Sequence, residues 1–391
     1  MRAELLKEAT AMKGQLISWR RHLHQTPELD LSLPQTVAYV TEQLSEMGIP
    51  YETIANGAGV AALIGKGGKC FMLRSDMDAL PVQEETELPF ASQNGHMHAC
   101  GHDLHTAILL GAAKLLKAHE VELQGVVKLL FQPGEETFRG AEAVLDCGIL
   151  ENPHVDAAFA MHVSSTTPVG VIGYGTNPMS SVYGFKVTLT GRGGHGSTPE
   201  LCIDPINAGV QIYLALQSLI AREVPAAAEA VLTIGKFQSG NAANVIPERA
   251  ELEGTLRTFD RAITKHLIGR IGEVIKTVAE TYRVRAELEV LSNVPSVVCD
   301  KELNEEFRAS ICSLDPSLQV IPRFHAMGSE DFAFISQKIP KSSYFAIGAA
   351  VPDKSKWKAQ HNPQVLFNED CLPIGAASYA VVAIDWLAKR T

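Results

Sequence analysis

The sequence predicts an α/β protein in which a mixed sheet is sandwiched by helices and a smaller unit is inserted. Short apolar runs typical of buried strands alternate with helical patterns over most of the chain, as in a sheet covered on both faces. At 391 residues the chain exceeds the size at which one hydrophobic core usually continues to grow, so two domains are expected. Between residues 183 and 295 the pattern changes, which locates the insertion.

The larger domain is expected to comprise residues 1–182 and 296–391. Its first 48 residues have a helical pattern that is interrupted at Thr26-Pro27-Glu28. Apolar runs then predict strands, and helical patterns follow Asp103 and Gly140. The predicted strands lie at 60–65, 69–75, 126–132, 157–163 and 343–348, and the later helices lie at 301–312 and 374–388.

The inserted domain, residues 183–295, begins with a run from Phe185 that alternates with period two. A helix with Pro205 in its first turn follows Asp204. Two strands, a second helix and a last strand complete the unit, at 230–237, 249–259, 261–282 and 285–291. This βαββαβ order is that of a ferredoxin-like split βαβ unit, which can fold as its own domain.

Polar side chains stand where the predicted strands of the larger domain end. Asp76 and Asp78 follow one strand, Glu135 and Glu136 follow the next, and His162 closes another. Open α/β sheets place their functional sites at the carboxyl edge of the strands. We therefore expect these side chains to lie close together in the fold.

The stretch from His98 to His105 holds the densest group of metal-binding side chains in the chain. On extended backbone His98, Cys100 and His102 would project to one side. Asp103 stands where an N-cap belongs, so the positive end of the helix dipole is expected to favour the Cys100 thiolate. Taken singly, each residue is better explained as a buried cysteine or as a capping or surface histidine. Taken together, they favour a metal site.

Glu135 and Glu136 are adjacent carboxylates that repel each other unless a positive charge is near. Because adjacent side chains point in different directions, one can bind a metal ion while the other takes a proton from water as a general base. An isolated acidic pair is more often part of a solvated turn. The expected proximity of Cys100, His102 and His162 favours the catalytic alternative.

Composition argues against several classes of partner. A net charge of −10 disfavours nucleic acids and anionic membranes, because phosphate binding needs a basic surface. No segment is expected to span a membrane, and the amphipathic N-terminus lacks the apolar core of a signal peptide, so we expect a cytoplasmic location. Seven scattered cysteines, an odd number, argue against a disulfide framework.

Five motifs occur in a distinctive order around the insertion. They are Arg74-Ser-Asp76-Met-Asp78-Ala-Leu-Pro, Met97-His-Ala-Cys100-Gly-His102-Asp, Phe131-Gln-Pro-Gly-Glu135-Glu136, Gly193-Gly-His195-Gly-Ser-Thr-Pro and Asn244-Val-Ile-Pro. In this order the chain resembles the aminoacylase and hippurate hydrolase branch of the dinuclear metallopeptidases. That branch also contains indole-acetyl-amino-acid hydrolases and N-acetyldiaminopimelate deacetylases. The resemblance runs from about His22 to the C-terminus.

The resemblance implies a centre of two divalent metal ions. The implied ligands are Cys100, His102, Glu136, His162 and His361, with Cys100 bridging the ions in place of the aspartate of other branches. Glu135 would be the general acid/base, and Asp78 would support a ligand or orient the site. His98 and His105 become neighbours of the ligands. Mixed imidazole, carboxylate and thiolate ligands suit Zn, Mn, Co or Ni.

The implied reaction is metal-assisted amide hydrolysis, which would release an amino acid from an N-acyl amino acid such as an N-acetyl or N-benzoyl conjugate. A dipeptidase or carboxypeptidase is the alternative, because a peptide bond presents the same amide. A non-catalytic metal- or peptide-binding module is disfavoured because the catalytic set is complete. A structural zinc protein is disfavoured because structural sites are closed and rich in sulfur.

His195 and Asn244, both in the inserted domain, match positions that reach the substrate in related enzymes, often across a dimer. We expect this domain to act as a lid from which His195 stabilises the oxyanion. We also expect a homodimer formed through an exposed sheet edge or helix face of the same domain. The plainer alternative for His195 is a solvated histidine in a polar turn.

Overall fold

The computed structural model describes residues 2–390, which fold into two compact units. The first unit comprises the described residues up to Pro178, Val298–His325 and the chain from Asp331 onward. The second comprises Met179–Val297 with the short segment Ala326–Glu330. These boundaries lie a few residues from the expected ones, and the segment 326–330 was expected in the larger domain.

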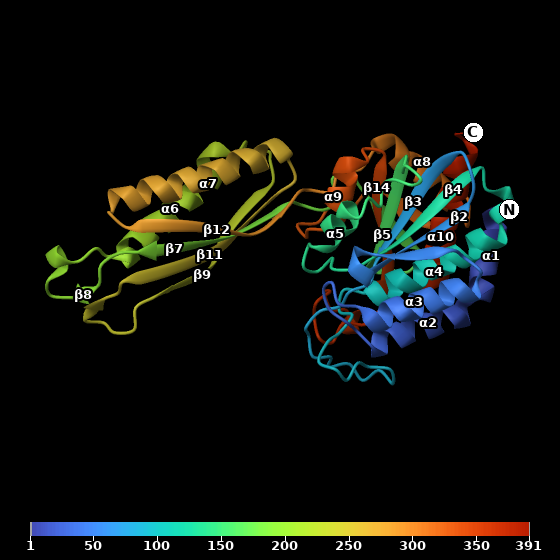
Figure 1. The fold of residues 1–391 in the computed structure, drawn as a ribbon, viewed down its shortest axis with the longest axis horizontal. Coiled ribbons are helices and arrows are strands. Elements are labelled where there is room, and N and C mark those ends of the chain that lie inside the picture. Colours follow the sequence, from blue (N-terminus) through green and yellow to red (C-terminus); the bar gives the residue numbers. More distant parts are fainter. Residues whose placement is uncertain (1, 391) are drawn as a thin grey trace. The chain divides into compact units, whose positions relative to one another are not determined.

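The first unit contains an eight-stranded mixed sheet of order β1-β2-β4-β3-β5-β14-β6-β13 (Figure 1). Strands β4, β3, β5 and β14 are parallel neighbours, whereas β2 pairs with β4, and β6 with β14, in antiparallel fashion. The strands are β1 Tyr51–Ile54, β2 Gly59–Gly65, β3 Lys69–Asp76, β4 Gly125–Gln132, β5 Ala157–Pro168, β6 Val171–Tyr174, β13 Gln319–Ile321 and β14 Ser342–Ala350. The predicted strands are confirmed; the short strands β1, β6 and β13 were not predicted.

Helices cover both faces of this sheet, as predicted for the fold class. The helices are α1 Arg2–Ala11, α2 Lys13–Gln25, α3 Pro34–Glu46, α4 His102–Ala118, α5 Gly140–Asp146, α8 Lys301–Cys312, α9 Phe332–Lys338 and α10 Cys371–Ala388. Helices α4 and α10 pack side by side on one face, and the short helices α5 and α9 lie together on the other (Figure 1).

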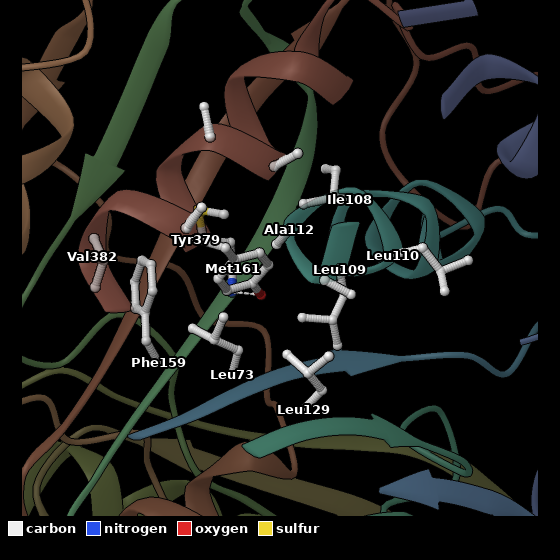
Figure 2. Packing of buried hydrophobic residues seen from close by; sticks show 14 of the residues in the cluster. Leu73, Ile108, Leu109, Leu110, Ala112, Leu129, Phe159, Met161, Tyr379 and Val382 are labelled. Atoms are coloured by element: carbon white, nitrogen blue, oxygen red, sulfur yellow. Dashed lines mark hydrogen bonds between the residues drawn. The ribbon is translucent and has the colours of Figure 1, made fainter. Parts of the chain in front are cut away.

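The core of the first unit lies between the sheet and the pair α4 and α10 (Figure 2). Leu73 of β3, Leu129 of β4 and Phe159 of β5 pack beneath Leu109 of α4 and Val382 of α10. Helix α10 is long and apolar enough to cross a membrane by length and composition, contrary to the expectation that no segment approaches that size. Because 89% of it is buried inside the protein, its apolar residues are explained by a central place in the core.

The second unit is a four-stranded antiparallel sheet of order β12-β7-β11-β9, with its own core against helices α6 and α7. Its elements are β7 Val182–Thr190, β8 Gly194–His195, α6 Pro205–Glu223, β9 Ala230–Ser239, β10 Val245–Ile246, β11 Arg249–Thr258, α7 Arg261–Thr281 and β12 Arg285–Val294. Asp204 and Asp260 cap the two helices, accepting hydrogen bonds from Ile206 N and Ala262 N at 2.8 and 2.7 Å. The predicted ferredoxin-like unit is confirmed.

A cluster of four buried charged or titratable side chains joins α2 to the start of α4. The guanidinium of Arg20 donates to Asp103 Oδ2 at 2.7 Å, and His24 Nδ1 lies 2.8 Å from the same oxygen. His24 Nε2 lies 3.1 Å from Glu84, whose carboxylate also accepts from Ser92 N and so fastens the irregular segment 81–97. The expectation that Asp103 caps α4 is wrong, because α4 begins at His102 with Gly101 as its N-cap, and Asp103 lies inside the first turn with its Oδ2 bound to these two partners.

Gly101 is the residue that precedes α4, in left-handed backbone with φ of +90°. A Cβ atom at this position would lie 2.5 Å from Val163 Cγ2. Glycine is therefore required both by the backbone conformation and by the close approach of β5.

The His24 cluster predicts a pH-dependent stability. Burial alone lowers the pKa of His24, but the Asp103 and Glu84 carboxylates raise it above the ordinary value near 6.5. A raised pKa contributes stability that is complete below about pH 6.5 and is lost as pH rises through the folded-state value. We therefore expect wild type to have a higher free energy of unfolding than His24→Gln, with a difference that is largest near pH 6 and becomes smaller toward pH 9. Urea unfolding of both proteins in the presence of a metal chelator measures this difference.

The exposed His154 offers a matched control, since His154→Gln should show little difference at any pH. A wild-type advantage over His24→Gln that stays constant or grows with pH would contradict the charged state assigned to His24.

Candidate metal centre

The five predicted ligands come together in the first unit from separate segments of the chain. Cys100 lies in the turn before α4, His102 begins α4, Glu136 follows β4, His162 lies on β5 and His361 lies in the loop before α10. Among the described residues, two groups of candidate ligand atoms within 4.8 Å of one another contain Cys100: Cys100 with His102 and His162, and Cys100 with Glu136 and His361. The groups share the sulfur of Cys100, which is the arrangement that a bridging ligand requires.

The segment before α4 is a turn, so the expectation of extended backbone is wrong. Gly101 N donates to His98 O at 3.1 Å, which closes the turn. His98 therefore does not share a side with Cys100 and His102. Its buried ring lies 6.4 Å from the ring of His24 and belongs to neither group of candidate ligands.

His102 is oriented by the backbone next to Asp78 and is surrounded by carboxylates. Its Nδ1 donates to Asp78 O at 2.9 Å, while the buried Nε2 has no hydrogen-bond partner. That Nε2 lies 3.8 Å from Glu136 Oε1 and 4.0 Å from Glu135 Oε2. Burial lowers the pKa of His102, but Asp76 and the other acids outweigh it and raise the pKa to about 10.

Asp78 holds the two adjacent glutamates in place. Its carboxylate oxygens accept hydrogen bonds from Glu135 N and Glu136 N, each at 3.0 Å. Gly134, with φ of +63°, turns the chain from β4 into this pair. Burial, together with the charges of Asp78 and Asp76, raises the pKa of Glu136 to about 7, and its Oε1 is a buried atom without a hydrogen-bond partner.

His162 presents the lone pair of its Nε2 to Cys100. Its Nδ1 donates to Val163 O at 2.7 Å, which leaves Nε2 facing Cys100 Sγ at 3.4 Å. Burial, reinforced by the neighbouring His105, holds the pKa of His162 well below its ordinary value. The ring is therefore neutral, as a metal ligand must be.

Cys100 does not have the predicted thiolate character in the metal-free protein. Burial raises the pKa of the thiol well above its ordinary value, and the Glu136 and Glu135 carboxylates add to the effect. The start of α4 is close by, but the nearby carboxylates outweigh the partial charge of the helix dipole. Deprotonation of Cys100 therefore needs a cation at the sulfur.

His361 is the most exposed of the five candidate ligands, with 56% of its side chain accessible. It has left-handed backbone with φ of +67°, and its N donates to Ala99 O at 3.0 Å. Its Nε2 lies 3.5 Å from Glu136 Oε2. The preceding Gln360 donates to Val163 O at 2.9 Å and so fixes the loop to β5. Sequence reasoning missed Gln360, because a glutamine in a polar loop carries no distinguishing pattern.

The arrangement fits divalent metal ions. The partnerless buried atoms His102 Nε2 and Glu136 Oε1 would gain a partner, and the mixed imidazole, thiolate and carboxylate donors suit Zn, Mn, Co or Ni. Asp76, His102 and His105 form another compact group, but His105 has no free nitrogen for a metal. Its Nδ1 donates to Asp76 Oδ1, and its Nε2 accepts from the backbone.

His195 and Asn244 belong to the second unit, where β8 and β10 bring them together. Gly196 N donates to Asn244 O at 2.8 Å, and the exposed His195 pairs with Val245 across the two strands. His195 Nδ1 accepts from Ser197 N at 3.1 Å, so the neutral ring carries its proton on Nε2. The expected role of these residues in substrate binding stays a prediction.

The chain is similar over nearly its whole length to several known hydrolases. It is 38% identical over 384 residues to an IAA-amino acid hydrolase of Arabidopsis thaliana, covering 96% of this chain and 86% of the relative. It is 37% identical over 380 residues to an N-acetylcysteine deacetylase of Bacillus subtilis, covering 96% and 97%. It is 33% identical over 397 residues to a thermostable carboxypeptidase of Saccharolobus solfataricus, covering 99% of each chain.

The fold is likewise similar to that of a solved dinuclear metal-binding peptidase of the M20 family from Bacillus subtilis. That structure matches with a TM-score of 0.83 and 34% identity, covering 97% of this chain and 99% of the other. The model of peptidase family M20/M25/M40 matches residues 72–385. The chain therefore belongs to this family of dinuclear metal-binding enzymes and is a metallo-amidohydrolase, a hydrolase of amide bonds.

Proposed function

We propose that this amidohydrolase releases a free amino acid and a carboxylic acid from N-acyl amino acids, using two divalent ions of Mn, Zn, Co or Ni. The observation that carries the proposal is the pair of compact ligand groups that share Cys100, with the buried Glu135 beside them. The printed activities of the IAA-amino acid hydrolase and the N-acetylcysteine deacetylase support an N-acyl amino acid as the substrate class.

Cys100, His102 and His162 would hold one ion, and Cys100, Glu136 and His361 the other. When bound, the ions supply Lewis-acid polarisation of the scissile carbonyl and lower the pKa of water. Asp78 keeps Glu135 and Glu136 apart by hydrogen bonds to their backbone, so that their carboxylates serve different roles.

Glu135 acts as the general base and then as the general acid. Its carboxylate takes a proton from the attacking water, whose oxygen forms the new bond to the carbonyl carbon. The same proton is delivered to the nitrogen as the C–N bond breaks, so the products are the carboxylic acid and the free amine. His195, which carries a proton on Nε2 when neutral, is proposed to donate a hydrogen bond to the oxyanion.

The second candidate is a carboxypeptidase or dipeptidase, which the similarity to the thermostable carboxypeptidase favours.

A dimer through the second unit is also part of the proposal. Exposed apolar side chains of α6 support it, namely Ile206, Val210, Tyr213 and Leu214, because they form a stripe along one face of the helix.

A substrate panel separates the two candidates. With Mn²⁺-loaded or Zn²⁺-loaded protein, we expect kcat/KM for N-acetyl and N-benzoyl amino acids to exceed that for dipeptides of the same amino acid by at least about tenfold, which corresponds to about 1.4 kcal/mol of transition-state discrimination. Release of the free amino acid is the measurement. Preferential cleavage of dipeptides would favour the carboxypeptidase or dipeptidase alternative.

Replacement of the general base tests the mechanism. Glu135→Gln should lower kcat by about 10²- to 10⁴-fold, because the amide cannot take the proton from water, while both ions stay bound. Turnover and metal content are measured on the same preparation. Glu151→Gln, an exposed substitution of the same kind, is the control and should match wild type. Turnover like that of wild type in Glu135→Gln would exclude this residue as the base.

The shared sulfur makes a prediction about metal stoichiometry. Cys100→Ser should lower the occupancy of both ions, because the atom that serves both ligand groups is replaced by a poorer donor. Metal content after dialysis is the measurement. Cys70→Ser, which changes another buried cysteine of the first unit outside both groups, should retain both ions. Loss of a single ion from Cys100→Ser would count against the bridge.

A further inference from the structure

Strand β5 separates from β3 just before it reaches His162. The parallel ladder between the two strands ends at the pair Arg74 and Ala160. On its other side β5 stays paired with β14 through Ser164 and, after a register shift, at Pro168. Backbone N–H groups alternate between the two sides of a strand, so those of Met161 and Val163 face the side that β3 has left.

Two side chains take the place of β3 at these positions. The hydroxyl of Tyr379, on α10, accepts a hydrogen bond from Met161 N at 2.8 Å (Figure 2). The same hydroxyl donates to Arg74 O at 2.6 Å. On the far side of His162, the Nε2 of His105 accepts from Val163 N at 2.8 Å. The residues immediately before and after His162 are therefore both held by side chains from helices.

His105 is itself fixed by Asp76, whose carboxylate forms a buried ion pair with Arg74. Its Nδ1 donates to Asp76 Oδ1, and Arg74 Nη1 donates to Asp76 Oδ2 at 2.7 Å. These bonds require the tautomer with the proton on Nδ1, because Nε2 acts as an acceptor. The ring also packs between the two candidate imidazole ligands, with centroids 4.5 Å from His162 and 5.3 Å from His102.

We propose that Tyr379 and the Asp76–His105 pair form a clamp that sets the position of His162 and thereby the affinity of its ligand group for a metal ion. The inference rests on the proposed function, since it takes Cys100, His102 and His162 to bind one ion. The polar atoms of the clamp side chains bind backbone, each other or, for Asp76 Oδ2, the guanidinium of Arg74. They are positioning residues, which act through His162.

Without the clamp, the N–H groups of Met161 and Val163, on either side of His162, would be buried without a hydrogen-bond partner. Such groups rearrange to find partners, and the imidazole of His162 would move with them. Loss of partners that orient a metal ligand typically costs about 10- to 100-fold in metal affinity. The effect should fall mainly on the ion that His162 binds.

The test uses the full chain after a chelator has removed any metal. Co²⁺ is titrated into this protein, and its binding is followed by the heat released and by the visible absorption of the bound ion. Tyr379→Phe and His105→Asn should each weaken one of the two binding events by about 10- to 100-fold. The weakened event should be the one that His162→Ala abolishes. His105→Gln should recover much of the affinity, because its amide oxygen reaches the Nε2 position and still accepts from Val163 N.

Tyr174→Phe is the matched control, since it removes another tyrosine hydroxyl of the first unit, one that donates to Glu305 at 2.7 Å. It should leave both affinities unchanged. Thermal unfolding in chelator shows whether each variant is folded. The clamp is overturned if folded Tyr379→Phe and His105→Asn bind both ions like wild type, or if His105→Gln is as impaired as His105→Asn. Wild-type protein that binds no Co²⁺ would overturn the proposed metal centre itself.

Discussion

The structure of the first unit depends on how it compensates the charge of several acids buried at one point. Carboxylates, a thiol and imidazoles share a volume in which each ionised acid raises the cost of ionising the other acids, whereas a protonated imidazole lowers that cost. In the metal-free protein, protons carry out that compensation: the pKa of Glu136 rises to about 7, that of His102 to about 10, and the Cys100 thiol keeps its proton. Metal binding is therefore an exchange of ions for protons.

The surrounding fold keeps these groups apart and correctly aimed. Asp78 separates the two glutamates through their backbone, and the buried Arg74 neutralises Asp76. A second layer of buried charge, with Arg20 and His24 against Asp103, holds the first turn of α4 that carries His102. The candidate ligands His102, Glu136 and His162 are thus each held by a hydrogen bond to neighbouring backbone or to the carboxylate of Asp78.

Most of the fold and the sheet edge that carries the candidate site followed from local sequence patterns, whereas the full ligand set, His361 included, followed from the family resemblance. Apolar runs predicted the main strands, and polar residues at their ends, such as Asp78 and His162, predicted the edge where the ligand groups meet. The details that failed depend on tertiary structure. Asp103 has the residue type of a helix cap, but it lies inside the first turn of α4, where its Oδ2 binds Arg20, which is distant in sequence. The role of Tyr379 carries no local signal, because a tyrosine in an apolar helix is indistinguishable from ordinary core.

The order of segments along the chain bears on how the centre is made. Strand β14 lies between β5 and β6 in the sheet, and His361 follows it, yet both come after the second unit in sequence. The second unit has its own core and can fold while the first still lacks an interior strand. During synthesis the cysteine, the glutamates and the first histidines therefore emerge long before their last partner. A nascent chain has only part of the candidate ligand set until the C-terminal strand and loop are in place.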